Sequence, residues 1–182
     1  MAGKTHAALW SALFLALAPG TVAVLIPWLI SGWVFQPAPS GFMLARIFGA
    51  MLIVIGAIIL LESFARFALH GFGTPSPTFP TRRLIVGGFY RFVRNPMYVA
   101  LMSTVLGQGL LFWNMGVLAY AGAVWVACHI FVMTYEEPKL RETFGWEYES
   151  YCFNVPRWLP RPGPWKNKKI ELPPEEKVLP LD

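Results

Sequence analysis

Long apolar runs dominate the sequence and predict helices that cross a membrane. Each of four runs comes close to the ~20 residues that span a bilayer core about 30 Å thick. The runs cover approximately residues 7–35, 43–66, 96–113 and 115–136. The last two are separated only around Asn114, which predicts a tight helical hairpin. The first is overlong and contains Pro19 and Pro27, so we expect a kink or a short interfacial piece before its span.

The pattern changes after the fourth run to that of an amphipathic helix. Between Pro138 and Tyr151 the charged side chains occupy different helical faces from the larger apolar ones. The apolar face consists of Leu140, Phe144, Tyr148 and Tyr151. We expect this helix to lie against the cytoplasmic membrane surface or to cap the bundle.

Two proline-rich stretches interrupt the helical pattern. The linker 71–95 begins with GTPSPTFPTRR and predicts a loop, because proline lacks the amide donor and restricts the residue before it. Residues 162–182 mix prolines with charges and are predicted to form a poorly ordered tail. Residues 1–161 are therefore expected to form one membrane-embedded domain of the all-α class, with four transmembrane helices.

Composition supports a lipid environment. Of 182 residues, 55% are hydrophobic and 14% are charged, which is too apolar for a soluble domain of this length. The formal charge of +5 comes from cations gathered between and after the apolar runs, a pattern of membrane topology that disfavours nucleic acid as a partner. Cys128 and Cys152 lack the spacing of a zinc site or a disulfide framework, so we expect no metal.

The distribution of cations predicts the orientation of the chain. One group of cations precedes the third run, and a second group follows the fourth run. Both groups are expected on the cytoplasmic side. They are Arg82, Arg83, Arg91 and Arg94 in the first group and Lys139, Arg141, Arg157, Arg161, Lys166, Lys168 and Lys169 in the second. The linkers 36–42 and 113–115 carry no lysine or arginine, so both chain termini are predicted to be cytoplasmic. Arg46 is the exception, and its long side chain can reach the outer interface.

The segment LIVGGFYRFVRNPMY, residues 84–98, is the first candidate for chemistry. It ends with Asn95, a favoured N-cap, and Pro96, a favoured first helical residue. A helix that starts at the cytoplasmic surface presents free amide donors and a partial positive charge to an anionic ligand group. The alternative is a well-capped helix beside arginines that anchor to lipid headgroups.

The second candidate is the pair Glu136 and Glu137 at the end of the fourth run. Adjacent carboxylates at a helix C-terminus oppose the helix dipole and repel each other, so a partner should compensate them. Arg91 or Arg94 would do so structurally, whereas a ligand's ammonium group or ribose hydroxyls would do so functionally. Both candidate segments fall at neighbouring ends of the predicted hairpin, where their side chains can converge on one pocket.

Two further groups of ionisable residues lie at the end of the second apolar run and within the fourth. Glu62, Arg66 and His70 are spaced by four, and an ordinary helical ion pair accounts for them. His129 lies within the fourth run, where either an interhelical hydrogen bond or a functional role would explain it.

The two segments together resemble the signature of the isoprenylcysteine carboxyl methyltransferase family and of the related membrane phospholipid methyltransferases. The resemblance rests on GGFYRFVRNPMY followed by EEPKLRETFGWEYESYCFNVPRWLPR, two motifs in the right order around a helical hairpin. It covers about residues 82–160, whereas the earlier runs share only the general topology with this family.

The resemblance implies an enzyme that holds S-adenosylmethionine between the loop before the third run and the end of the fourth. The residues it implies for cofactor binding are Gly88, Tyr90, Asn95, Pro96, Met97, Tyr98, Gln108, Tyr135, Glu136 and Glu137. The residues it implies for catalysis are Arg94, Arg157 and Glu137. Asn95 departs from the histidine of many relatives, which removes the residue expected to titrate near neutral pH.

The methyl acceptor implied is a lipid or small hydrophobic molecule that enters from the bilayer. Arg94 or Arg157 would orient a carboxylate, as of a prenylcysteine, whereas Glu136 or Glu137 would help to deprotonate an amine. A phospholipid amine and a small thiol are therefore alternatives to the carboxylate. An NADPH-dependent, steroid-reductase-like enzyme and a non-catalytic membrane subunit remain as rival classes, although paired glutamates favour a cofactor with an ammonium group over one with several phosphates.

Overall fold

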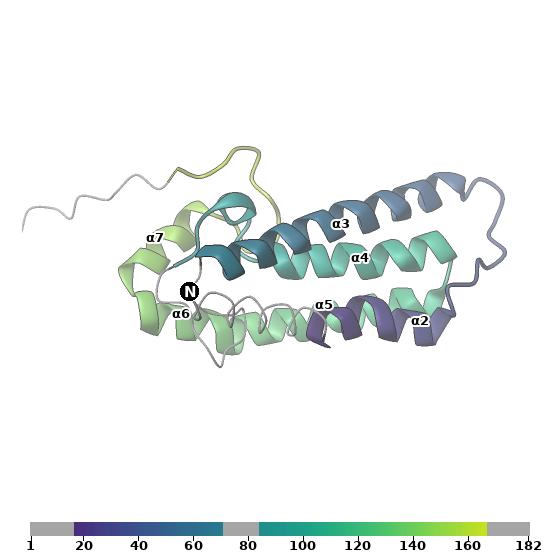
Figure 1. Ribbon diagram of the computed structural model, residues 1–182, viewed down its shortest axis with the longest axis horizontal. Coiled ribbons are helices and arrows are strands. Elements are labelled where there is room, and N and C mark those ends of the chain that lie inside the picture. Colours follow the sequence, from purple (N-terminus) through teal and green to yellow (C-terminus); the bar gives the residue numbers. More distant parts are fainter. Residues whose placement is uncertain (1–16, 71–83, 167–182) are drawn as a thin grey trace, which may run out of the picture.

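The computed structural model describes residues 17–70 and 84–166, with side chains described to residue 66 in the first range (Figure 1). All regular structure in these ranges is helical, so the all-α prediction is confirmed for the part of the chain described. In chain order the elements are η1 (Thr21–Leu25), α2 (Ile26–Ser31), α3 (Met43–His70), η2 (Gly88–Arg91), α4 (Pro96–Phe112), α5 (Met115–Phe131), η3 (Val132–Glu136), α6 (Glu137–Phe144) and α7 (Trp146–Asn154). The start of the proline-rich linker, the side chain of His70 and residues 167–182 lie outside the described residues.

Two helices are long and apolar enough to cross a membrane. They cover Met43–Arg66 and Met115–Phe144, and only 11% and 17% of their most apolar windows are buried inside the protein. Apolar helices with so little burial need an apolar environment outside the protein, which is what a membrane supplies. The helical segments Leu17–Ser31 and Pro96–Phe112 are apolar but shorter.

The N-terminal helical segment ends at Ser31, earlier than the predicted run, and it is irregular where kinking was expected. It passes through a π-helical turn, η1, before Pro27 in the first turn of α2. Because proline has no amide hydrogen, Pro27 leaves the carbonyl of Ala23 without its usual helical donor. That carbonyl accepts instead from Gln108 Nε2 of α4 at 2.6 Å, which fastens this segment to the bundle.

Helices α3 and α4 run antiparallel and pack closely along their length (Figure 1). Small residues permit the contact: a Cβ placed on Gly49 would lie 2.7 Å from the carbonyl oxygen of Gly107. Further along, a Cβ on Gly56 would lie 2.7 Å from the carbonyl oxygen of Ala100. Close backbone approach through small residues is a common mode of helix packing in membranes.

The predicted hairpin between α4 and α5 is present. Helix α4 ends at Phe112, Trp113 adopts a left-handed conformation with φ of 54°, and α5 begins at Met115. Asn114 caps α5 because its side chain accepts a hydrogen bond from Val117 N at 3.1 Å. The hairpin brings the start of α4 and the end of α5 to the same end of the molecule.

The helix predicted at 138–151 is split and is continuous with the fourth run. Helix α5 continues through the π turn η3 directly into α6, and Pro138 lies in the first turn of α6. Gly145, with φ of 49°, then separates α6 from α7. The predicted apolar face is nevertheless used, because Leu140 and Phe144 pack against a buried cluster of Tyr148, Tyr151 and Val155.

The predicted tail packs against the protein at its start. Trp165 lies against the Tyr151 ring with 5.6 Å between ring centroids, and its amide donates to the carbonyl of Arg91 at 2.9 Å. Arg161 N donates to Phe92 O, also at 2.9 Å. Residues 155–166 therefore form a C-terminal strap across the loop that precedes α4.

Candidate functional site

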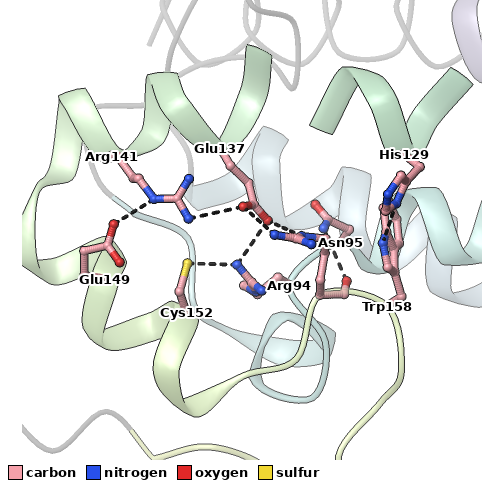
Figure 2. Close-up of polar contacts among 9 residues, drawn as sticks. Arg94, Asn95, His129, Glu137, Arg141, Glu149, Cys152 and Trp158 are labelled. Atoms are coloured by element: carbon pink, nitrogen blue, oxygen red, sulfur yellow. Dashed lines mark hydrogen bonds and ion pairs between the residues drawn. The ribbon is translucent and has the colours of Figure 1, made fainter. Parts of the chain in front are cut away.

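A polar cluster occupies the end of the bundle where α4 begins and η3 passes into α6. Glu137 is at its centre and is 2% exposed. Arg157 of the strap binds this carboxylate with two nitrogens, Nε to Oε1 at 2.6 Å and Nη2 to Oε2 at 2.9 Å. Arg94 Nη1, from the loop before α4, donates to Oε1 at 3.0 Å (Figure 2). The two predicted motifs therefore converge on Glu137.

Three residues of α6 and α7 extend the cluster. Arg141, one turn after Glu137, donates from Nη2 to Glu137 Oε2 at 3.3 Å and from Nε to Glu149 Oε1 at 2.7 Å. Arg94 Nη1 also lies 2.9 Å from Cys152 Sγ, as Figure 2 shows. Three guanidinium groups thus surround one buried carboxylate, which favours its ionised form.

Glu136 has a different environment from its neighbour. It is half-buried, and its Oε2 accepts a hydrogen bond from Tyr98 Oη, in the first turns of α4, at 2.9 Å. Among residues 17–70 and 84–166, no arginine or lysine forms an ion pair with Glu136. Of the two adjacent carboxylates, one is therefore paired with arginines, whereas the other accepts from a neutral hydroxyl.

Asn95 precedes α4 as predicted, but its side chain does not cap the helix. Its Nδ2 instead donates to the carbonyl of Arg157 at 3.3 Å, and the neighbouring Arg94 N donates to Pro156 O at 2.9 Å. Pro96 is the first helical residue. The side chain of Asn95 therefore leaves the first amides of α4 uncapped.

His129 holds the strap to α5 from the other side. Trp158 Nε1 donates to His129 Nδ1 at 3.1 Å (Figure 2). The imidazole also stacks on Trp125, with 5.3 Å between ring centroids. The hydrogen bond of His129 therefore joins α5 to the non-helical strap and is not the interhelical bond that the sequence suggested.

The pKa values of the arginine and tyrosine side chains around the cluster are shifted by ion pairing and by burial. The hydrogen bonds to Glu137 raise the pKa of the Arg157 guanidinium. Burial raises the pKa of the hydroxyls of Tyr90, Tyr148 and Tyr151. These phenols therefore remain protonated at neutral pH, and Tyr151 Oη donates to Tyr90 O at 2.6 Å.

Gly88 and Tyr90, two residues of the first motif, lie against the bundle. Gly88 has φ of +57°, and a Cβ there would overlap the guanidinium of Arg66. Arg66 is itself paired with Glu62 one turn earlier on α3, as the spacing of four predicted. Tyr90 is buried. Close packing of η2 on α3 explains why glycine suits position 88.

Gln108 and Tyr135 are not brought into the cluster around Glu137. Gln108 lies about 18 Å along α4 from Pro96 at 1.5 Å per residue, and it bonds to Ala23 O and Trp33 Nε1. Tyr135 is 43% exposed and contacts Phe131 and Lys139. The described contacts of both residues are structural.

Three contributors to the site were missed by the sequence analysis. Arg141 is four residues after Glu137, and that spacing was a usable signal. Cys152 and Trp158 carried no local signal, because their partners are 58 and 29 residues away in the chain. Arg91 was considered as a partner of the glutamates, whereas its Nε donates to Trp165 O at 2.7 Å.

The helices and the cluster define a membrane-associated, all-helical protein with a polar site at one end of a helical hairpin. A sequence model of the phospholipid methyltransferase family matches residues 44–147, more than half of the chain. The chain belongs to this family, which is related to the isoprenylcysteine carboxyl methyltransferases, so the predicted relationship is confirmed. A comparison with curated proteins found none that matches.

Proposed function

We propose that this protein is an integral membrane enzyme that transfers the methyl group of S-adenosylmethionine to a lipidic or small hydrophobic acceptor. The family supports methyl transfer in a membrane as the general activity. One observation in this chain carries the proposal: its two motifs converge. Tyr98 Oη of the first motif donates to Glu136 Oε2 of the second at 2.9 Å, and Arg94 of the first binds Glu137 of the second.

The residues present suit S-adenosylmethionine, whose amino-acid part carries an ammonium and a carboxylate. Glu136 lacks a cationic partner among the described residues and would take the ammonium. The uncapped first amides of α4, at Met97 and Tyr98, would take the carboxylate. S-adenosylmethionine would supply an electrophilic methyl group there.

The residues of this chain would contribute mainly by binding and orientation, because methyl transfer from a sulfonium releases a neutral leaving group. Glu137 holds Arg94 and Arg157 at the rim of the site. The strap ties Arg157 to Asn95 and Trp158 to His129 and would help to keep water from the reacting groups. Gln108 would not touch the cofactor. Its role would be to hold the N-terminal helical segment against α4 through its bond to Ala23 O.

Two acceptors remain candidates for different reasons. A prenylcysteine-like carboxylate matches the two motifs, and the guanidinium nitrogens of Arg94 or Arg157 that do not bind Glu137 would orient it. A phospholipid amine matches the description of the family, and Glu136 would help to deprotonate it. Incubating membranes that contain the enzyme with methyl-labelled S-adenosylmethionine, and then identifying the labelled lipid, distinguishes the two acceptors.

We also propose that residues 1–161 form one domain of four spans with the site and both termini on the cytoplasmic side. The two shorter apolar helices are supported as spans by their packing within the bundle. The cations of the cluster and of the strap support the cytoplasmic side. Helices α6 and α7 would then lie at the membrane surface.

Calorimetry with S-adenosylhomocysteine tests the cofactor assignment. We expect binding by the purified protein in detergent, and about tenfold or greater weakening in Glu136→Gln, because a charge-assisted hydrogen bond to the ammonium is lost. Glu142→Gln is the matched control, since Glu142 is an exposed residue of α6 and should leave binding unchanged. Absence of binding in detergent and in lipid alike would refute the proposal.

A further inference from the structure

The opposite end of the bundle carries a hollow that the proposed methyl transfer does not use. It lies where the linker 32–42 meets the start of α3 and has a volume of about 510 Å³, within the range of small-molecule sites. Its lining consists of Phe35, Gln36, Pro37, Ala38, Pro39, Gly41, Phe42, Met43 and Arg46. With about 1.5 Å per residue, the 28 residues of α3 place this hollow roughly 40 Å from the other end of that helix.

Arg46 is the only charged residue of the lining. Its Nη2 donates to Gln36 O at 2.6 Å, and its guanidinium lies over the Phe35 ring at 5.4 Å from the centroid. Its Nε is buried and has no hydrogen-bond partner. The cation is therefore held in place by the linker, and no carboxylate of the lining neutralises it. The buried Nε does not face the hollow, whereas Nη1 makes no hydrogen bond within the described residues and is the donor left for a ligand.

The start of α3 adds to the positive potential of the hollow. A helix N-terminus carries a partial positive charge and free amide donors, which acidic residues usually offset. The first turn of α3 contains no acidic residue, and it contributes Met43 and Arg46 to the lining. The Arg46 guanidinium and the positive end of the helix dipole repel each other. An anion that binds between the two removes this repulsion, because it attracts both.

The surroundings of the hollow are apolar and exposed. Phe35 is 58% exposed, Met43 69% and Leu44 78%, so acyl chains could cover these side chains while a polar group enters the hollow. We propose that the hollow is a binding site for a phosphate group, recognised by the Arg46 guanidinium, Gln36 and the N-terminus of α3. Two sources share this chemistry, the headgroup of an anionic phospholipid and free inorganic phosphate.

Native mass spectrometry of the full chain in detergent measures this binding. The probes are dihexanoyl phosphatidylglycerol, dihexanoylglycerol without phosphate, and inorganic phosphate. We expect the phospholipid to bind at least tenfold more tightly than the glycerol, and Arg46→Gln to lose that difference. Arg161→Gln, at the other end of the bundle, is the matched control and should bind as the unmodified protein does.

Competition identifies the source of the phosphate. Displacement of the phospholipid by inorganic phosphate at similar concentration would assign the site to the free ion, whereas failure to displace it would assign the site to a lipid. Equal binding of phospholipid by Arg46→Gln and the unmodified protein would overturn the proposal.

A second measurement needs no variant. Phenylglyoxal modifies accessible arginines, and we expect the phosphatidylglycerol, but not the phosphate-free glycerol, to slow modification of Arg46 relative to Arg161. Equal rates with and without the phospholipid would overturn the proposal even if Arg46→Gln failed to fold. Neither result depends on methyl transfer, since the hollow and the Glu137 cluster lie at opposite ends of the bundle.

Discussion

Glu136 and Glu137 are adjacent, yet they have opposite kinds of partner. Glu137 is surrounded by Arg94, Arg157 and Arg141, whereas Glu136 accepts from the neutral hydroxyl of Tyr98. The arginines satisfy the charge of Glu137 within the protein, which suits a residue that organises the site. Glu136 has no cationic partner among the described residues, which is why the proposed function assigns the ammonium of the cofactor to it.

The organising role of Glu137 predicts a large stability cost for Glu137→Gln. The substitution keeps the shape but leaves the guanidinium of Arg94, whose side chain is 11% exposed, without its carboxylate. Removing one partner of a buried ion pair typically costs about 3–5 kcal/mol. We expect a loss of that order in the free energy of unfolding, measured by denaturant titration in detergent.

Glu149→Gln is the control for this prediction. Glu149 pairs with Arg141 alone, and its side chain is 48% exposed, so screening by water should keep the loss below about 1 kcal/mol. Similar losses in the two variants would contradict the assignment of Glu137 as the centre of the cluster.

Close helix packing and proline-linked π turns shape the elements that carry the site. Both π turns, η1 and η3, end shortly before a proline, Pro27 and Pro138, because each proline removes an amide donor and its ring crowds the preceding turn. The turn η3 contains Glu136 and is followed at once by Glu137. An irregular turn therefore sets the directions of the two carboxylates relative to α4.

The contact between α3 and α4 predicts that Gly107→Ala is destabilising. A Cβ at Gly107 would lie 2.9 Å from Cγ1 of Ile53 and 3.0 Å from its backbone nitrogen, so the helices would have to separate. Overpacking of this kind typically costs about 1–3 kcal/mol. Thermal unfolding in detergent should show a lower midpoint for this variant.

Gly122→Ala is the matched control on α5. A Cβ at Gly122 meets nothing within 4 Å, and alanine has a helix propensity higher than glycine by roughly 1 kcal/mol. This variant should unfold at the same temperature or higher. The account of the α3–α4 contact would be contradicted if Gly122→Ala lowered the unfolding midpoint, or if Gly107→Ala left the midpoint unchanged.

The whole molecule has two chemically different ends. One end carries the Glu137 cluster, the strap and the short helices α6 and α7, and the other carries the linker 32–42 and the hairpin at Asn114 (Figure 1). With four spans these ends would face opposite sides of the membrane. The cationic end would be cytoplasmic.

Single cysteines at the two ends test this topology. In a protein whose native Cys128 and Cys152 are replaced by alanine, we expect a membrane-impermeant thiol reagent to label Ser40→Cys from outside intact cells. Glu142→Cys should react only after the cells are opened. Both positions are exposed, so access depends on the membrane. Labelling of both from outside would exclude opposite placement.

Local patterns in the chain were enough to predict its helical class, the hairpin at Asn114 and the meeting of the two motifs. These features depend on apolar periodicity, on turn residues and on the tendency of consecutive helices to pack side by side, all of which act over short distances along the chain. The pairing of Glu62 with Arg66 was predictable for the same reason, since both residues lie on one helix face.

The partners of the two glutamates depend on the folded arrangement. Successive residues of a helix differ in direction by about 100°, so neighbours face different elements. Whether Glu136 or Glu137 faces the arginines is decided by the π turn η3 and by Arg94 and Arg157, which lie 43 and 20 residues from Glu137 in the chain. Asn95 likewise had the position of a cap, but a carbonyl of the strap lay within reach of its side chain. Long-range contacts of this kind leave no periodic trace in a sequence, because any residue of suitable chemistry can be brought to the site by the fold.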